Sequence, residues 1–564
     1  MARRLSTRTL LALAALAALA PAAAAQAQPA QPRFTRADTL RGSIGPGRAW
    51  WDAAFYDLDL EVIPADSAIR GRTGITYRVL QPATEMQIDL AAQLRVDSIV
   101  QDGRRLAVRR DGDAMFVTLA SPQQAGTTRT LTVYYHGRPR VARQAPWDGG
   151  FVWTRDAAGD PWIATAVQGL GASAFWPNKD HQSDEPDSQR VAVTVPRGMT
   201  DVSNGRLRST TQNPDGTTTF EWFVSSPINN YNVTVNAGSY AHFSDVYQGE
   251  NGPLTLDFYP LAMNEAAARR QFAQVKPMLA CFERWFGPYP WYEDGFKLIE
   301  TPHLGMEHQS AVAYGNGYVN GYRGQDLSGT GLGLQWDYII IHEAGHEWFG
   351  NNITSTDLAD MWVHEGFTTY SEGIYTECQQ GKEAGARYII GERQQISNDA
   401  PVQGVHFGVN EEGSGDMYFK GASMLHTIRH VIDDDERWRG ILRGLNATFG
   451  RRPESVTGAQ VQEYMSREAG MDLGKVFQQY LTTTDVPVLE YRIQNGTLSY
   501  RWANVVPGFD MPVRVTTAPG TFERITPTEQ WRTVPARGVT AGTFRVDENF
   551  YVEARNAAAR AGKR

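Results

Sequence analysis

Residues 339–349 constrain this chain most, because they place two histidines and a glutamate at a fixed spacing. His342 and His346 are four positions apart, so on a helix both imidazoles project from one face, one turn apart. Three isoleucines before them and an aromatic pair after them predict a partly buried helix. Two imidazoles at this spacing can hold one Zn²⁺, and Glu343 can reach a metal-activated water without being a ligand. The segment therefore predicts a zinc site with Glu343 as general base.

A zinc ion needs at least three protein donors, so the third ligand must come from another segment. A third histidine six residues after the second would indicate a metzincin, but that position holds Asn352, and Phe349 replaces the required glycine. After eighteen further residues beyond His346 comes Glu365, on a second expected helix for which Asp360 is the predicted N-cap. Two histidines and one glutamate leave a coordination position open, which is typical of catalytic zinc.

Residues 45–245 are predicted to form an N-terminal all-β domain. Apolar and polar residues alternate there, as half-buried strands require, and turn dipeptides such as Asp111-Gly112 separate the runs. The expected strands include residues 56–62, 74–79, 131–135, 191–195 and 231–235.

Residues 246–485 are predicted to form a mostly helical domain that contains the zinc site. Helical periodicity begins after Asn264, the expected N-cap of the first helix, which Pro277 is expected to interrupt. The expected helices cover residues 264–286, 336–349, 360–375, 420–431, 457–469 and 473–481. Strands then return around Asn495-Gly496, a type I′ turn signal, so residues 486–556 are predicted to form a small β domain.

Both ends of the chain are predicted to lie outside these domains. Three arginines, a short apolar run and small residues near position 27 have the pattern of a secretory signal peptide, so we expect residues 1–27 to be removed. The protein is then secreted or periplasmic, and no membrane span is expected after cleavage because the sequence has no other apolar run of sufficient length. Residues 557–564 are predicted to be a disordered tail.

The net charge and the cysteine content further restrict which partners and which kinds of fold the sequence is compatible with. The formal net charge of -8 argues against nucleic acid as a partner, since an acidic protein gains nothing from phosphates. Cys281 and Cys378 leave two interpretations open, a disulfide or two buried thiols, and the fold does not depend on a disulfide framework. The acidic run at 433–436 is interpreted as a solvated loop. Nothing in these patterns indicates an oligomeric state.

The spacing of His342, His346 and Glu365 resembles the zinc site of the M1 family of aminopeptidases, the gluzincins that include aminopeptidase N. Further similar segments are residues 304–308, 348–351, 362–367 and 418–421. Within them, Leu304, His308 and His364 replace the family's Gly, Asn and Asn. The similarity runs from about residue 50 to 485. It implies a multidomain α+β fold: an N-terminal β-saddle domain, a thermolysin-like, mostly helical catalytic domain and, beyond it, a small C-terminal β domain.

The resemblance also implies roles for residues outside the ligand set. Tyr418 is expected to donate a hydrogen bond to the oxyanion, and Glu307 to pair with the α-ammonium group of the substrate. The implied substrate-binding residues are Glu307, Met306, Gly305 and Gln168. Glu372 lies seven residues after Glu365 on the same helical face, where it is either a partner of a zinc ligand or a solvated side chain.

These patterns predict a short, secreted, bacterial-type M1 enzyme with one Zn²⁺ per chain. It would hydrolyse the N-terminal bond of peptides that have a free N-terminus, with broad or apolar preference. Two alternatives use the same zinc site, an endopeptidase and an epoxide hydrolase, although Glu307 argues against a pure endopeptidase. A non-enzymatic peptide-binding protein is a further alternative, which intact Glu343 and Tyr418 disfavour.

Overall fold

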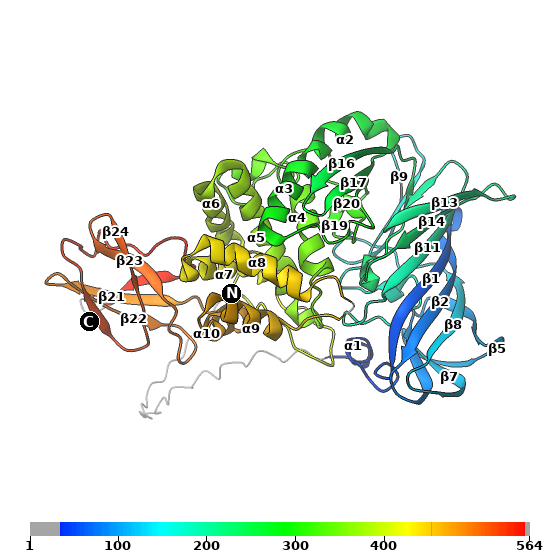
Figure 1. The fold of residues 1–564 in the computed structure, drawn as a ribbon, viewed down its shortest axis with the longest axis horizontal. Helices are drawn as coiled ribbons and strands as arrows, with labels where there is room; N and C mark the ends of the chain where they lie inside the picture. The colour runs from blue at the N-terminus through cyan, green and yellow to red at the C-terminus, as the bar shows by residue number, and fades with distance from the viewer. Residues whose placement is uncertain (1–33, 453, 559–564) are drawn as a thin grey trace, which may run out of the picture. The chain divides into compact units, whose positions relative to one another are not determined.

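The computed structural model describes residues 34–452 and 454–558, in which a strand-rich part, a helix-rich part and a second strand-rich part follow one another (Figure 1). This order confirms the predicted fold class. The predicted signal peptide lies outside the described residues, and so does the predicted tail apart from residues 557 and 558. In the described ranges no helix is long and apolar enough to cross a bilayer.

The first part is built on an eight-stranded sheet with the strand order β13-β14-β11-β1-β2-β8-β4-β5. Its strands are β1 (Trp51–Ile63), β2 (Ala68–Val79), β4 (Leu94–Gln101), β5 (Arg104–Arg105), β8 (Thr128–Gly137), β11 (Ser188–Val195), β13 (Arg206–Gln212) and β14 (Thr218–Val224). Along β1 the side chains of Tyr56, Leu58 and Leu60 are buried while their neighbours are less so, which is the alternation that the sequence shows.

Two smaller sheets complete this part of the chain. One contains β3 (Ala83–Asp89), β6 (Ala107–Asp111) and β7 (Ala114–Gln123). The other contains β9 (Gly150–Arg155), β10 (Pro161–Ala166), β12 (Thr200–Val202) and β15 (Asn236–Gly238). A short helix, α1 (Arg36–Gly42), precedes them.

The strand expected at residues 231–235 is wrong. Residues 230–232 form a 3₁₀ turn, and extended backbone follows until β15 begins at Asn236. The Asn229 side chain accepts a hydrogen bond from the Tyr231 backbone N–H, and asparagine favours such turns. The run of asparagines around Tyr231 was therefore the signal against a strand.

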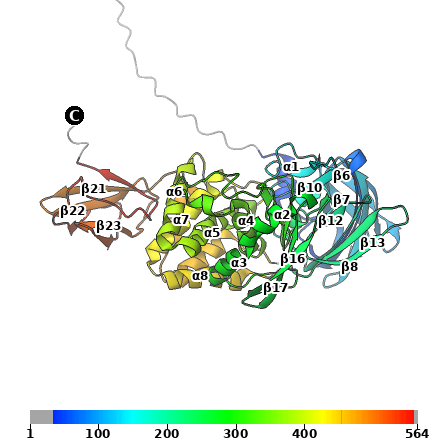
Figure 2. The same ribbon diagram turned by 90° about the horizontal axis from the view of Figure 1, so that it is seen from above.

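The helix-rich part begins with a five-stranded sheet, β16 (Phe243–Gly249), β17 (Gly252–Tyr259), β18 (Phe296–Glu300), β19 (Gly305–Met306) and β20 (Val312–Tyr314). Its helices are α2 (Glu265–Gln271), α3 (Val275–Phe286), α4 (Tyr338–Gly345), α5 (Trp362–Gln380), α6 (Lys382–Glu392), α7 (Phe419–Ile432), α8 (Asp435–Phe449), α9 (Gly458–Ala469) and α10 (Gly474–Thr482). Helix α5 packs against α3, α4, α6 and α7, and both ribbon views show it among them (Figures 1 and 2).

Several details of this part refine or correct the sequence analysis. The first helix is interrupted as expected, because a 3₁₀ turn separates α2 from α3 and leaves Pro277 in the first turn of α3. Asp360 does not cap α5: its carboxylate accepts from Gly458 N and Gln403 Nε2, and the residue before α5, Met361, makes no side-chain cap.

The acidic run at 433–436 is exposed at Asp433, Asp434 and Glu436, as expected, but only its first half is a loop, because α8 begins at Asp435. Asp434 caps α8, and Asp435 pairs with Arg429 at 2.8 Å and with Lys382 at 2.6 Å. Cys281 on α3 and Cys378 on α5 form a disulfide, which decides between the two interpretations left open by the sequence.

The last part of the chain contains two small sheets. One is formed by β21 (Val488–Gln494), β22 (Thr497–Ala503), β25 (Arg532–Pro535) and β26 (Glu553–Asn556), and the other by β23 (Val513–Ala518) and β24 (Thr521–Ile525). Asn495 and Gly496 have φ values of 51° and 72°, so the type I′ hairpin turn is confirmed. The exact domain boundaries given above stay predictions.

Candidate active site

Helices α4 and α5 bring three buried side chains together. Glu365 Oε2 lies 3.6 Å from His342 Nε2 and 3.3 Å from His346 Nε2. Ligand atoms around a tetrahedral zinc ion at the usual bond lengths are about 3.3 Å apart, so this set has the size of a zinc site. Glu365 Oε2 is also buried with no hydrogen-bond partner among the described residues, as expected for an oxygen directed at a cation. The donor set therefore fits zinc.

A hydrogen bond at Nδ1, the ring nitrogen that does not face Glu365, orients each of the two histidines. His342 Nδ1 donates to Glu372 Oε1 at 2.7 Å, and His346 Nδ1 donates to the Phe349 carbonyl at 3.0 Å. Tyr388 in turn donates to the other oxygen of Glu372 at 2.8 Å. These bonds leave each Nε2 as the lone-pair nitrogen that a metal requires. Glu372 is thus the partner of a candidate zinc ligand and is not solvated.

The start of α4 fixes the direction of the segment that carries both histidines, with His342 on α4 and His346 directly after its last residue, Gly345. Asp337 caps it by accepting hydrogen bonds from the backbone N–H groups of Ile339 and Ile340. The same carboxylate accepts a hydrogen bond from the Tyr314 hydroxyl at 2.7 Å, which ties the cap to strand β20. The helix is therefore held against the sheet that carries Gly305.

Glu343 lies beside the candidate ligands, with strand β19 close against it. A Cβ atom on residue 305 would lie 2.5 Å from Glu343 Oε1, so only glycine leaves room for the carboxylate at that position. Burial raises the pKa of Glu343 to about 7, against the opposing effect of the nearby histidines. Such a carboxyl group can exchange a proton near neutral pH.

Glu307 lies in the same buried cluster, and its carboxylate is held by a tyrosine that the sequence analysis did not find. Tyr231 donates a hydrogen bond to Glu307 Oε1 at 3.0 Å. Burial and the Glu307 carboxylate raise the pKa of Tyr231, so its hydroxyl remains a donor. Asn351 donates to the Glu307 carbonyl at 2.8 Å, which fixes the backbone of the same residue.

One cavity of about 410 Å³ is lined by every residue that the sequence analysis proposed for the site. These residues are Gln168, Gly305, Met306, Glu307, His342, Glu343, His346, Glu365 and Tyr418. Tyr418 immediately precedes α7, and its ring centroid lies 6.1 Å from that of His342. The structure therefore brings the proposed residues together, and their roles remain predictions. Further lining residues that the sequence analysis missed include Trp147, Tyr322 and Leu327.

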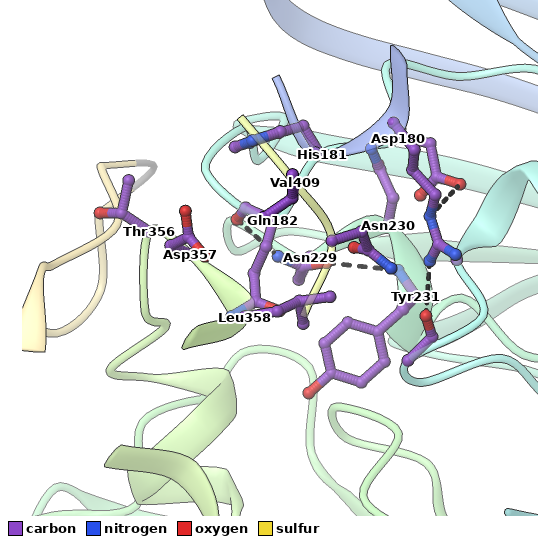
Figure 3. A pocket seen from close by; sticks show the side chains of 15 residues that line it. Asp180, His181, Gln182, Asn229, Asn230, Tyr231, Thr356, Asp357, Leu358 and Val409 are labelled. Carbon is purple, nitrogen blue, oxygen red and sulfur yellow. Dashed lines mark hydrogen bonds and ion pairs between the residues drawn. The ribbon is translucent and has the colours of Figure 1, made fainter. Parts of the chain in front are cut away.

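A second, smaller hollow is lined in part by Tyr231 (Figure 3), whose hydroxyl donates the hydrogen bond to Glu307. Its volume of about 40 Å³ has room for only a few water molecules. Asn229 donates to the Gln182 carbonyl there, and Arg41 donates to the Gly169 carbonyl at 2.6 Å. Figure 3 shows the Tyr231 hydroxyl pointing away from Asp180. The polar residues of the hollow therefore hold the segment that delivers Tyr231 to Glu307.

All three departures from the family motifs are buried here, and Leu304 lines the cavity. His364 Nε2 accepts a hydrogen bond from the Ser355 backbone N–H at 2.9 Å, so it holds the chain before α5. His308 follows Glu307, and neither of its ring nitrogens has a hydrogen-bond partner among the described residues. Burial lowers the pKa of both histidines, so both are neutral at pH 7.

Comparisons with known proteins agree with the motif analysis. Residues 271–480 match the sequence model of the peptidase family M1 domain. Aminopeptidase B of Rattus norvegicus is 25% identical over 300 residues, which cover 50% of this chain and 42% of that protein. A probable aminopeptidase 1 of Saccharolobus solfataricus is 21% identical over 423 residues, or 72% of this chain and 50% of that protein. The chain thus spans about half the length of these curated relatives.

A solved M1 zinc metallopeptidase from Deinococcus radiodurans has the same fold. It aligns with a TM-score of 0.64 and 23% identity, covering 78% of this chain and 96% of that one. A mutant of the same enzyme bound to a Tyr-Ser-Ala substrate aligns with a TM-score of 0.64 and 22% identity over the same shares of the two chains. The resemblance to the M1 family that the motifs predict is therefore confirmed.

Proposed function

We propose that this chain is a zinc-dependent M1 aminopeptidase that hydrolyses the N-terminal bond of peptides outside the cytoplasm. The observation that carries the proposal is that buried Glu307 shares one cavity with Glu343 and the candidate zinc ligands. The match of residues 271–480 to the peptidase family M1 model supports the same activity. The structural relative, which was solved with a Tyr-Ser-Ala substrate, supports it as well.

Glu307 selects the end of the peptide. Burying a carboxylate costs free energy unless the charge is paired with a cation. The single hydrogen bond from Tyr231 offsets only part of that cost for Glu307. The α-ammonium group of a peptide is a cation that fits a cavity of this size. When Glu307 holds the ammonium group, the first peptide bond of the substrate lies next to Glu343.

Glu343 and Tyr418 then act on that bond. A zinc ion held by His342, His346 and Glu365 would supply a Lewis acid able to polarise a carbonyl group and to lower the pKa of water. Glu343 accepts the proton of the attacking water and transfers it to the departing amine nitrogen. Tyr418 donates a hydrogen bond to the oxyanion that forms on the carbonyl.

The location outside the cytoplasm rests on two features. Residues 1–27 have the secretory pattern described above. The Cys281–Cys378 disulfide supports the same location, because disulfides persist in oxidising compartments. Fractionation of cells that produce the full chain tests this: uncleaved protein that remains in the cytoplasm with residues 1–27 attached would contradict it.

The activity is tested by mass spectrometry of one peptide and its N-acetylated twin after incubation with the zinc-loaded mature protein. We expect stepwise loss of N-terminal residues from the free peptide only. Internal cleavage of both peptides would replace the proposal by an endopeptidase. If neither peptide is cleaved, the assignment as a peptidase is wrong.

A further inference from the structure

Trp147 is the lining residue whose exposure needs an explanation. It lines the cavity that holds the candidate metal site, yet 57% of its surface is exposed. Burying an indole is strongly favourable, and exposed large aromatics beside a binding cavity often contact a ligand. No motif discussed above includes this residue.

The turn that carries Trp147 holds the indole in a defined place. Asp148 accepts hydrogen bonds from the backbone N–H groups of Arg143 and Gln144, at 2.8 and 2.9 Å. Trp147 N donates to the Gln144 carbonyl at 3.0 Å. Gly149 packs so closely on Leu170 that a Cβ atom there would lie 2.7 Å from the Leu170 Cβ. The turn is thus tied to itself and to the loop after Gln168.

Arg323 lies against the indole. Its guanidinium carbon is 5.8 Å from the Trp147 ring centroid, within the range of a cation–π contact. Across the described ranges, 34–452 and 454–558, no carboxylate forms an ion pair with Arg323. The cation therefore adds an uncompensated positive charge beside the exposed indole.

Aromatic rings continue from this region to the candidate metal ligands. Tyr322 and Leu327 also line the cavity, and Tyr322 packs edge-on against Tyr338 with ring centroids 5.2 Å apart. Tyr338 stacks on the imidazole of His342 at the same centroid distance. The cavity therefore combines acidic groups near the metal site with an aromatic and apolar region, and the exposed Arg323 contributes a positive charge against the Trp147 ring without lining the cavity.

We propose that Trp147 is a specificity-determining residue that binds an aromatic or branched apolar side chain flanking the cleaved bond. Arg323 is its positioning residue, and its charge disfavours peptides that carry Lys or Arg at that place. This inference rests on the proposed aminopeptidase function and names the substrate class of that site.

The test uses two series of short peptides with free N-termini, in which either the first or the second residue is Ala, Leu, Phe or Lys. We measure kcat and KM for the zinc-loaded protein, for Trp147→Ala and for Arg323→Gln. Trp147→Ala is expected to lower kcat/KM for the Phe and Leu peptides of one series roughly tenfold, mainly through KM. The Ala peptides should change less than about twofold, since a methyl group loses little contact. Arg323→Gln is expected to raise the rate on the Lys peptide relative to the Phe peptide.

Trp531 and Arg501 provide a control pair of the same residue types, in which Arg501 is also ion-paired with Glu490. Arg501 lies 5.0 Å from the Trp531 ring centroid, and neither residue lines the cavity. Trp531→Ala and Arg501→Gln should leave the peptide preferences unchanged. Equal zinc content and equal thermal unfolding midpoints would show that the Trp147 and Arg323 variants are folded.

The outcomes separate this inference from the proposed function. An active protein whose preferences are the same with and without Trp147 in both series would overturn the inference and leave the aminopeptidase intact. A protein that cleaves no free peptide would overturn the aminopeptidase. In that case calorimetric binding of the Phe peptide decides the role of Trp147: weaker binding to Trp147→Ala supports it, and equal binding overturns it.

Discussion

The two walls of the cavity are built differently. On one wall the candidate zinc ligands and Glu343 lie on buried helices, and each histidine has a hydrogen bond behind it. The other wall is supplied by turns and loops of the strand-rich part, with Gln168 and Trp147 lining the cavity and Tyr231, which does not line it, donating a hydrogen bond to Glu307. Chemistry that needs a fixed geometry thus lies on rigid elements, while loops supply the contacts to the substrate. Changes to the helical wall should therefore lower kcat or metal content, and changes to the loop wall should alter KM and preference.

The largest effect is expected for Glu343→Gln on the helical wall. The amide cannot accept the proton of the attacking water, so kcat should fall by about a thousandfold. Zinc content measured by inductively coupled plasma mass spectrometry should stay at one ion per chain, because Glu343 is not a ligand. A fall of less than tenfold would show that the helical wall does not contain the general base.

A smaller effect on the same wall is expected for Glu372→Gln. The amide no longer supports the His342 imidazole with a charged acceptor, so zinc affinity should fall by about 10- to 100-fold. Competition with a chelator measures this affinity. Glu383→Gln is the matched control, because Glu383 is exposed on α6. Equal zinc affinity for both variants would contradict the assigned role of Glu372.

On the loop wall, Tyr231→Phe tests whether Tyr231 positions Glu307. The variant loses one hydrogen bond to a charged group, about 1.5 kcal/mol, so KM should rise roughly tenfold. We expect kcat to change little, since the Tyr231 hydroxyl acts through its hydrogen bond to Glu307. Tyr134→Phe, at an exposed tyrosine, is the control. A fall in kcat with an unchanged KM would remove the distinction between the two walls.

The smallest effect on catalysis is expected for Glu185→Gln, also in the strand-rich part. Burial raises the pKa of Glu185 from 4.5 to about 8, so the folded protein keeps a proton that the unfolded chain releases. This group therefore lowers the free energy of unfolding as pH rises from about 4.5 to about 8, by at most about 1.4 kcal/mol per pH unit. Urea unfolding at both ends of this range should show a flatter pH dependence for the variant. An identical slope for the two proteins would contradict this.

The same difference between the walls explains what could be predicted from sequence. His342, His346 and Glu365 lie close in the chain on two neighbouring helices, so spacing and helical geometry reveal them. Glu307, Tyr418 and Gln168 were reached only through the family resemblance, because their approach to the zinc site depends on long-range packing. Tyr231 lay in a segment interpreted as a strand, and Trp147 has no local pattern at all. Contacts made between distant loops leave no periodicity in the sequence.

The most direct test of the account is the ratio of kcat/KM for a free peptide to that for its N-acetylated twin, in the unaltered protein and in Glu307→Gln. We expect a ratio well above a hundred for the unaltered protein, because only the free ammonium group pairs with Glu307. In the variant this ratio should fall at least tenfold, while zinc content stays the same. A variant that retains the full ratio would contradict the claim that Glu307 makes this metal site an aminopeptidase.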